Sequence, residues 1–397
     1  MSKPKKIEFS QREPGVEKGE KPEFGTKRHV LCASVAAAAG LGLLALFGGC
    51  RSKEPGDAKP EPPAASISQQ DFQILVQKLS DPSCRVAAEA AIELGKLGDS
   101  RAIPLLIHMD NRGFMELVEA PTEALKMFDV EQVIPLLMDA LRTFPPGELP
   151  NKLFGEVPGQ VNMFLEQSGQ AGAAHLLSAL EEQNSILRAR VAVIIRNMVE
   201  YHGVGPEQFG PKLASMLSDP EYMARLEAAT ALGVLKYAPA VPELERCLEE
   251  DPNWMVRSNV ARALGEIGDP SAEPALIEAL GDGSPVVIGQ AAQALGKLKA
   301  EAAIQPLIEA YGRSNTTIEI GGALASIGQS AVQALIRALE NPDSKIREHS
   351  AIALATICDP DAIEPLTRVS NKDPDSDVRS AASYAARTIA EGCSTQE

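Results

Sequence analysis

The sequence predicts an all-α protein whose helices pair into hairpins that stack as an α-solenoid. The chain has 397 residues, of which 44 % are hydrophobic and only 4 % aromatic. A core made mainly of Ala, Leu, Ile and Val suits closely packed helices better than a sheet, which favours aromatic and β-branched residues. Two independent sequence markers also recur together at a period of 31 or 32 residues, which is typical of a protein built of repeats.

The first marker is a proline that opens an apolar helix. It recurs at positions 104, 135, 211, 242, 274, 306 and 365. The second marker is an Asp-Pro or Asn-Pro step with an arginine six residues after the Asp or Asn. It reads Asp219-Pro220…Arg225, Asp251-Pro252…Arg257, Asn341-Pro342…Arg347 and Asp373-Pro374…Arg379.

Each unit is interpreted as an αα-hairpin of about 31 residues. The Asp or Asn can cap the first helix, and proline suits its first position. Apolar residues follow at helical spacing, as in Val260, Leu264 and Ile267, and Gly268 ends the helix because glycine tolerates the left-handed conformation of a C-cap. One hairpin cannot bury its apolar face alone, so neighbouring hairpins must stack.

These units resemble HEAT repeats, of the short, Ala- and Gly-rich class related to bilin lyases. The resemblance spans residues 67–392 and implies a right-handed α-solenoid of about nine hairpins plus a terminal half-unit. It also implies that the Asp and Arg of successive units form a ladder between neighbours, and that second helices line the concave face. The arginines at the ladder position are Arg225, Arg257, Arg347 and Arg379.

The N-terminal segment has the features of a targeting signal. Lys27 and Arg28 form a basic flank, residues 30–49 lack charge, and Cys50 follows two glycines. This segment resembles a bacterial lipoprotein signal, which implies cleavage before Cys50 and lipidation of Cys50. The alternatives are an uncleaved membrane anchor, since about 18 uncharged residues can span a bilayer, and a buried apolar helix.

Both membrane interpretations place the chain after Cys50 outside the cytoplasm, because the basic flank stays inside. Arg51, where Asp would retain the protein at the inner membrane, favours the outer membrane if the cell has two. The expected organisation is an export signal or anchor at 1–49, a Pro-rich tether at 50–66, the first HEAT-like repeats at 67–140, an irregular joint at 141–172, and regular repeats with a C-terminal tail at 173–397.

Charge and motifs argue against several classes of function. A net charge of −16 repels phosphate and disfavours nucleic acid as a partner. A di-iron hydroxylase of this architecture uses His-Glu dipeptides as metal ligands, and the sequence has none. It also lacks a zinc-type cluster, a GxSxG motif and a Gly-rich phosphate loop. We therefore expect no catalytic residue, no metal and no cofactor.

Cysteine spacing supports neither a disulfide framework nor a redox motif. Cys84, Cys247 and Cys358 lie among apolar helical residues and are interpreted as buried thiols. Cys393 lies near the end of the given sequence. Outside the cytoplasm a disulfide at Cys393 remains an alternative, although the cysteine spacing does not support one.

The surfaces that the sequence suggests for binding are acidic or aromatic. Second helices carry outward glutamates that would form a stripe for a basic protein segment, with a merely solvated face as the alternative: Glu243, Glu245, Glu249, Glu273, Glu278 and Glu309. Trp254, the only tryptophan, is interpreted as an interface anchor or as packing on the neighbouring turn. Phe144, Phe154 and Phe164 either seal the irregular joint or line an exposed apolar groove.

We therefore expect a membrane-anchored scaffold or adaptor of the bacterial cell envelope, which binds protein partners on an extended surface. The alternatives are a HEAT-like enzyme, related to the di-iron hydroxylase or to bilin lyases, and a structural spacer with no specific ligand. The missing His-Glu pairs count against the hydroxylase. The export signal counts against the lyase, because bilins are attached in the cytoplasm.

Overall fold

The fold is known from a computed structural model that describes residues 68–110, 113–143, 157–203, 205–313 and 315–393. These residues all belong to one compact unit, which begins at Pro63. Helices dominate them, and no strand occurs within the described ranges. The predicted all-α solenoid is confirmed.

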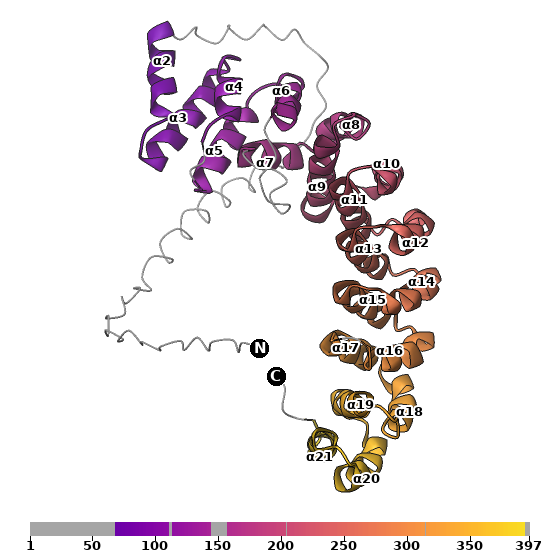
Figure 1. Cartoon of the computed structure of the whole chain (residues 1–397). Helices are drawn as coiled ribbons and strands as arrows, with labels where there is room; N and C mark the ends of the chain where they lie inside the picture. Colours follow the sequence, from indigo (N-terminus) through magenta and orange to yellow (C-terminus); the bar gives the residue numbers. More distant parts are fainter. Residues whose placement is uncertain (1–67, 111–112, 144–156, 204, 314, 394–397) are drawn as a thin grey trace, which may run out of the picture. The chain divides into compact units, whose positions relative to one another are not determined.

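The helices alternate along the chain between two rows, as Figure 1 shows. The odd row consists of α3 (Cys84–Leu97), α5 (Glu116–Leu125), α7 (Gly159–Gln167), α9 (Ser185–His202), α11 (Tyr222–Leu235), α13 (Trp254–Ile267), α15 (Pro285–Leu298), α17 (Thr317–Ile327), α19 (Ser344–Ile357) and α21 (Ser376–Ala390). The even row consists of α2 (Gln69–Lys78), α4 (Ala102–Ile107), α6 (Val130–Thr143), α8 (Gly169–Ala179), α10 (Gly210–Ser215), α12 (Val241–Glu250), α14 (Glu273–Glu278), α16 (Ile304–Ala310), α18 (Gln329–Ala338) and α20 (Ile363–Lys372).

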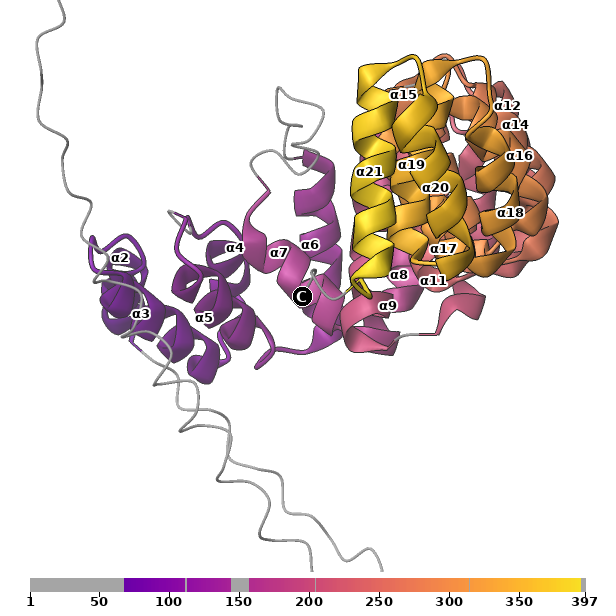
Figure 2. The same ribbon diagram turned by 90° about the horizontal axis from the view of Figure 1, so that it is seen from below.

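Short 3₁₀ turns join many of these helices. They are η1 (Pro206–Gln208), η2 (Met216–Ser218), η3 (Ala238–Ala240), η4 (Pro270–Ala272), η5 (Ala279–Gly281), η6 (Glu301–Ala303) and η7 (Pro360–Ala362). Each odd-row helix from α3 to α19 contacts the next odd-row helix, and even-row helices such as α12 and α14 also meet. Figure 2 shows the same two layers in the C-terminal repeats from a second direction.

The odd-row helices begin later than expected: the capping residue lies two positions after the Asp or Asn of the predicted step, so the expected capping by Asp251 and Asn341 is wrong. Asn253 caps α13 by accepting a hydrogen bond from the N–H of Met255, and Asp343 caps α19 in the same way. Gly268 ends α13 with φ of 78°, which is the left-handed conformation that glycine favours. The local rules of capping therefore set the limits of the repeating helices.

A glycine near the end of α11, α13 and α15 lets the next odd-row helix approach closely. A Cβ on Gly233 of α11 would lie 2.9 Å from the Cα of Ala263 on α13. A Cβ on Gly265 of α13 would lie 2.8 Å from the Cα of Ala294 on α15. Because real Cβ atoms do not come this close to backbone, only glycine permits this spacing of the odd row.

Part of the segment 141–172 forms a helical hairpin. Residues 144–156 lie outside the described ranges, but α7 and the start of α8 fall within this segment. On α7 the buried side chain of Gln160 donates to the carbonyls of Leu106, Ile107 and Met109 at 2.7–3.1 Å. This contact closes the C-terminal end of α4, whose last carbonyls have no helical partner.

Candidate protein-binding site

A ladder of arginine–aspartate pairs joins successive odd-row helices. Arg225 on α11 binds Asp251, which precedes α13, through Nε at 2.6 Å and Nη2 at 3.0 Å. Arg257 on α13 binds Asp282, which precedes α15, in the same way at 2.7 Å and 2.9 Å. Such two-pronged pairs fix both the distance and the register between neighbouring helices.

The ladder has one rung that the sequence markers do not predict. Arg188 on α9 binds Asp219 at 2.6 Å although no Asp-Pro step precedes it. Arg347 on α19 binds Asp373 at 2.8 Å and 2.9 Å. Arg379 on α21 instead donates to the backbone carbonyl of Asp373 at 2.8 Å. The predicted position is therefore correct, and at Arg379 the contact is to the backbone of its own Asp-Pro step.

These rungs keep their carboxylates ionised. Burial alone would raise the pKa of Asp251, but hydrogen bonds from Arg225 and the N–H of Asn253 outweigh it and lower the pKa. The pKa of Asp282 is lowered for the same reasons, against burial, chiefly by Arg257. The rungs at Arg225 and Arg257 are thus charged pairs at neutral pH.

Between α9 and α21, two odd-row helices lack the arginine. It is the fourth residue of α11, α13 and α19, whereas the fourth residue of α15 is Ile288 and that of α17 is Ile320. Both isoleucines are buried. The junctions from α15 to α19 are therefore joined by apolar contacts at the ladder position.

A groove of about 660 Å³ lies between α12 and α14. Glu245 and Glu249 line it from α12, and Glu278 lines it from α14. Leu248 and Ala279, both buried, also line it. The rest of its lining is Pro242, Arg246, Ser271, Pro274, Ala275, Gly281 and the ladder acceptor Asp282. The groove is therefore tied directly to the rung at Arg257.

The three groove glutamates have no ion-pair partner in the described residues. The only arginine in the lining, Arg246, donates to the hydroxyl of Ser218 at 3.2 Å. Carboxylates that no internal cation neutralises attract a cation from outside. The groove is therefore suited to a positively charged segment.

The structure divides the predicted acidic stripe into two sets. Glu245, Glu249 and Glu278 come together in the groove, whereas Glu243, Glu273 and Glu309 are absent from its lining. On α16, Glu309 lies 3.7 Å from Arg313 and accepts a hydrogen bond from Gln305. Sequence spacing identified the acidic character of the even row but could not show which side chains share a groove.

The predicted aromatic anchors have different surroundings. Trp254, the first residue of α13, is 45 % exposed. Phe164 on α7 is 4 % exposed and packs in the core, so it offers no side chain to a partner, and the exposed-groove interpretation fails for this residue. Phe144, Phe154 and the lipidation candidate Cys50 lie outside the described residues.

The cysteines require a correction. Cys358 is not a free buried thiol: it ends α19 and forms a disulfide with Cys393, with Cα atoms 6.3 Å apart. The sequence did not predict this pair because the two residues are 35 positions apart and meet only when α21 folds back on α19. Burial raises the pKa of the Cys247 thiol to about 12, so this thiol stays protonated at neutral pH.

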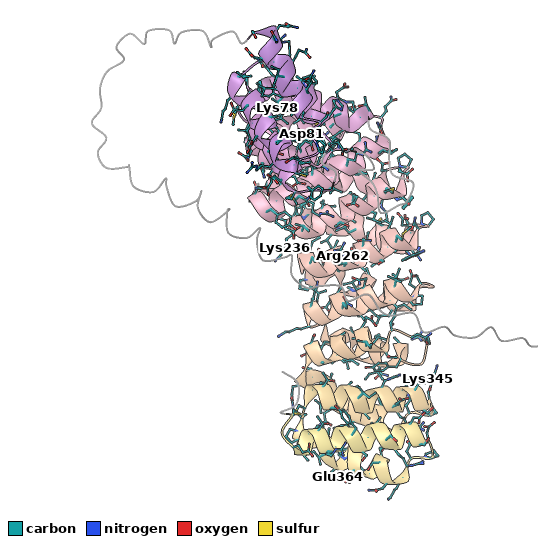
Figure 3. The ribbon with its side chains drawn as sticks, turned by 90° about the vertical axis from the view of Figure 1, so that its left-hand side faces the viewer. Lys78, Asp81, Lys236, Arg262, Lys345 and Glu364 are labelled. Atoms are coloured by element: carbon teal, nitrogen blue, oxygen red, sulfur yellow. A yellow bond between two sulfur atoms is a disulfide. The ribbon has the colours of Figure 1, made fainter. Side chains whose placement is uncertain are left out.

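The polar side chains along the odd row form a network that the sequence did not indicate. Arg196 on α9 lies 3.4 Å from Glu227 on α11, and Asn197 donates to Glu166 of α7 at 2.7 Å. Burial raises the pKa of both glutamates. Arg262 on α13, labelled in Figure 3, continues the network by donating to the hydroxyl of Thr230 on α11 at 3.3 Å.

No three His, Cys, Asp or Glu side chains in the described ranges are placed to hold a metal ion. Among the described histidines, His349 has its ring centroid 5.2 Å from the ring centroid of Tyr311. Within the same residues, every helix is too short or too polar to cross a membrane.

Comparison with known proteins identifies the family. The HEAT repeat model matches residues 72–149, 173–258, 241–320 and 313–387, which together exceed half of the chain. The protein therefore belongs to the HEAT-repeat family.

Among curated proteins it is similar to phycocyanobilin lyase subunit alpha of Microchaete diplosiphon. The two are 26 % identical over 190 residues, which are 45 % of this chain and 65 % of the relative. The chain thus spans slightly less than two thirds of that relative.

Two solved structures share its fold. The match to Kap121p has a TM-score of 0.50 at 12 % identity and covers 82 % of this chain and 41 % of that one. The match to importin beta has a TM-score of 0.50 at 13 % identity and covers 79 % of this chain and 50 % of that one. At such identities the likeness concerns the solenoid fold alone.

Proposed function

We propose that this protein is an exported, membrane-anchored scaffold, and that the groove between α12 and α14 binds a basic segment of a protein partner. The observation that carries the proposal is the set of three groove carboxylates that have no ion-pair partner in the described residues, against one arginine in the groove lining. Partner recognition would combine electrostatic attraction with contacts to the apolar lining.

The location rests on two further features. A basic flank, an uncharged stretch and Cys50 form a lipoprotein-type pattern. The disulfide between Cys358 and Cys393 suits an oxidising compartment, because cytosolic thiols are kept reduced. A chain purified from membranes that retains residues 1–49 and carries no lipid on Cys50 would contradict a lipid anchor.

The groove is tested with a fluorescent octalysine peptide and a triple charge reversal, Glu245→Lys, Glu249→Lys and Glu278→Lys. The matched control reverses three glutamates outside the groove, Glu243→Lys, Glu309→Lys and Glu364→Lys, so that net charge changes equally. We expect the groove variant to lose at least about tenfold in affinity and the control to lose much less. Equal losses would mean that net charge, and not this groove, attracts the peptide.

A second candidate function follows from the likeness to a phycocyanobilin lyase subunit. In that case the chain would help to attach a bilin to an acceptor protein, alone or with a further subunit. Incubation with phycocyanobilin and an acceptor protein would then yield a covalently coloured acceptor. An unchanged acceptor would favour the scaffold.

A further inference from the structure

Apolar side chains are exposed in register at the starts of three successive odd-row helices. They are Tyr222 and Met223 on α11, Trp254 and Met255 on α13, and Val286 on α15, and together they are named the apolar edge. Trp254 is 45 % and Val286 47 % exposed, and the other three are partly exposed. Tryptophan, tyrosine and methionine are frequent anchors in protein interfaces.

The three helices begin at the same level of the stack. Each has 14 residues. The twelfth residue of one helix packs on the tenth residue of the next, as Gly233 does on Ala263 and Gly265 on Ala294. Their first residues therefore share one border of the odd row. Figure 3 shows the two borders through Lys345, at the start of α19, and Lys236, after the end of α11.

The acidic groove ends at this same border. Glu249 is the ninth residue of α12, and only residues 250–253 separate it from Trp254. Asp282, which lines the groove, is four residues before Val286. Four or five residues of chain reach at most about 14–18 Å, so the carboxylates and the apolar edge lie within the span of one short peptide.

We propose that the apolar edge and the groove bind one continuous partner segment, in which a basic stretch is followed by apolar side chains at every third residue. This inference rests on the proposed function, since the basic stretch is the part that occupies the groove. Charge complementarity selects a basic segment, and the exposed tryptophan and valine select apolar residues next to it.

The spacing of the edge indicates the conformation of that segment. Packed helices lie about 8–10 Å apart, so the apolar side chains recur at that distance. A polyproline II segment returns every third side chain to one side after about 9 Å. A β-strand does so after about 6.6–6.8 Å, at every second residue, and does not match.

Three labelled peptides test the inference. The first has four lysines followed by nine prolines, the second has four lysines followed by three Leu-Pro-Pro triplets, and the third has the composition of the second with its leucines consecutive. We expect the second peptide to bind about tenfold more tightly than the first, because two or three leucines bury part of their surface, and the third to gain less. Equal binding of the second and third peptides would overturn the spacing.

Matched variants test whether the apolar edge causes the tighter binding of the second peptide. Trp254→Ala with Val286→Ser should abolish the advantage of the second peptide and leave the first peptide bound as before. The control, Ile352→Ser with Tyr384→Ala, alters side chains of similar exposure on α19 and α21 and should keep the advantage. Urea unfolding confirms that both variants fold.

The outcomes separate the two proposals. If the first peptide binds and the leucines add nothing, the apolar edge is overturned while the groove stands. If no lysine peptide binds at low ionic strength, the groove fails and the edge inference fails with it. If the edge variant retains the full advantage, the leucines bind elsewhere and the inference is wrong.

Discussion

The junctions from α9 to α15 differ from those between α15 and α19 in what joins one repeat to the next. In the first region, three bidentate or short charged pairs link each odd-row helix to the next, at Arg188, Arg225 and Arg257. In the second, buried Ile288 and Ile320 take the arginine position. The same hairpin can therefore be stacked by a directional polar contact or by a non-directional apolar one.

This difference matters for the groove, which lies in the laddered region. Asp282 accepts both prongs of Arg257 and also lines the groove. A directional contact fixes the register of α13 and α15, and with them the ends of α12 and α14. The proposed binding surface therefore lies where charged pairs fix the spacing of the repeats.

The largest expected effect concerns the C-terminal end of the described stack, where a disulfide joins the end of α19 to Cys393 after α21. Replacing Cys358 and Cys393 by alanine opens a loop of 35 residues and should cost about 3–4 kcal/mol of unfolding free energy by the loop-entropy relation. Hydrogen exchange should rise in α19 to α21 while octalysine binding stays unchanged. Loss of binding in this variant would show that the groove depends on the distant end of the stack.

The next effect compares a rung with its apolar counterpart. Arg257→Ala leaves the Asp282 carboxylate half-buried without its partner and should cost about 2–4 kcal/mol near neutral pH. Ile288→Ala creates a cavity and should cost a similar amount. Urea unfolding at two pH values separates them, because the cost of losing the rung should shrink when Asp282 is protonated and the cost of the cavity should not. Equal pH dependence would contradict the polar character of the ladder.

Much of this contrast can be predicted from the sequence. The spacing between the Asp-Pro or Asn-Pro step and the arginine identified Arg225, Arg257 and Arg347, because each of these arginines donates to the backbone carbonyl of the Asp or Asn of its own step. Asp282 escaped detection since Gly283 follows it instead of proline. The local signals describe one hairpin, whereas a rung depends on two.

The groove and the disulfide were beyond sequence reasoning for a related reason. Whether Glu245 faces Glu278 or solvent depends on the angle between α12 and α14, which no local pattern encodes. Cys358 and Cys393 meet through the packing of α19 on α21. Properties of a surface between repeats therefore require the stacked structure.

A smaller effect follows from pH. The pKa of Asp251, Asp282 and Asp373 is lowered by folding, so each contributes stability above its ordinary value of 3.8 that is lost as pH falls through the lowered value. The pKa of Glu227 is raised, so its contribution is present below 4.5 and is lost as pH rises through the raised value. Glu227→Gln should therefore flatten the decline of stability above pH 4.5. An unchanged pH profile of urea midpoints would refute that role.

The most direct test of the central claim is a titration of fluorescent octalysine against three proteins at low and at physiological ionic strength. These are the unaltered chain, the groove variant with Glu245, Glu249 and Glu278 reversed to lysine, and the control with Glu243, Glu309 and Glu364 reversed. The account predicts salt-sensitive binding that the groove variant loses and the control largely keeps. Binding that survives in the groove variant, or that falls equally in both variants, would contradict it.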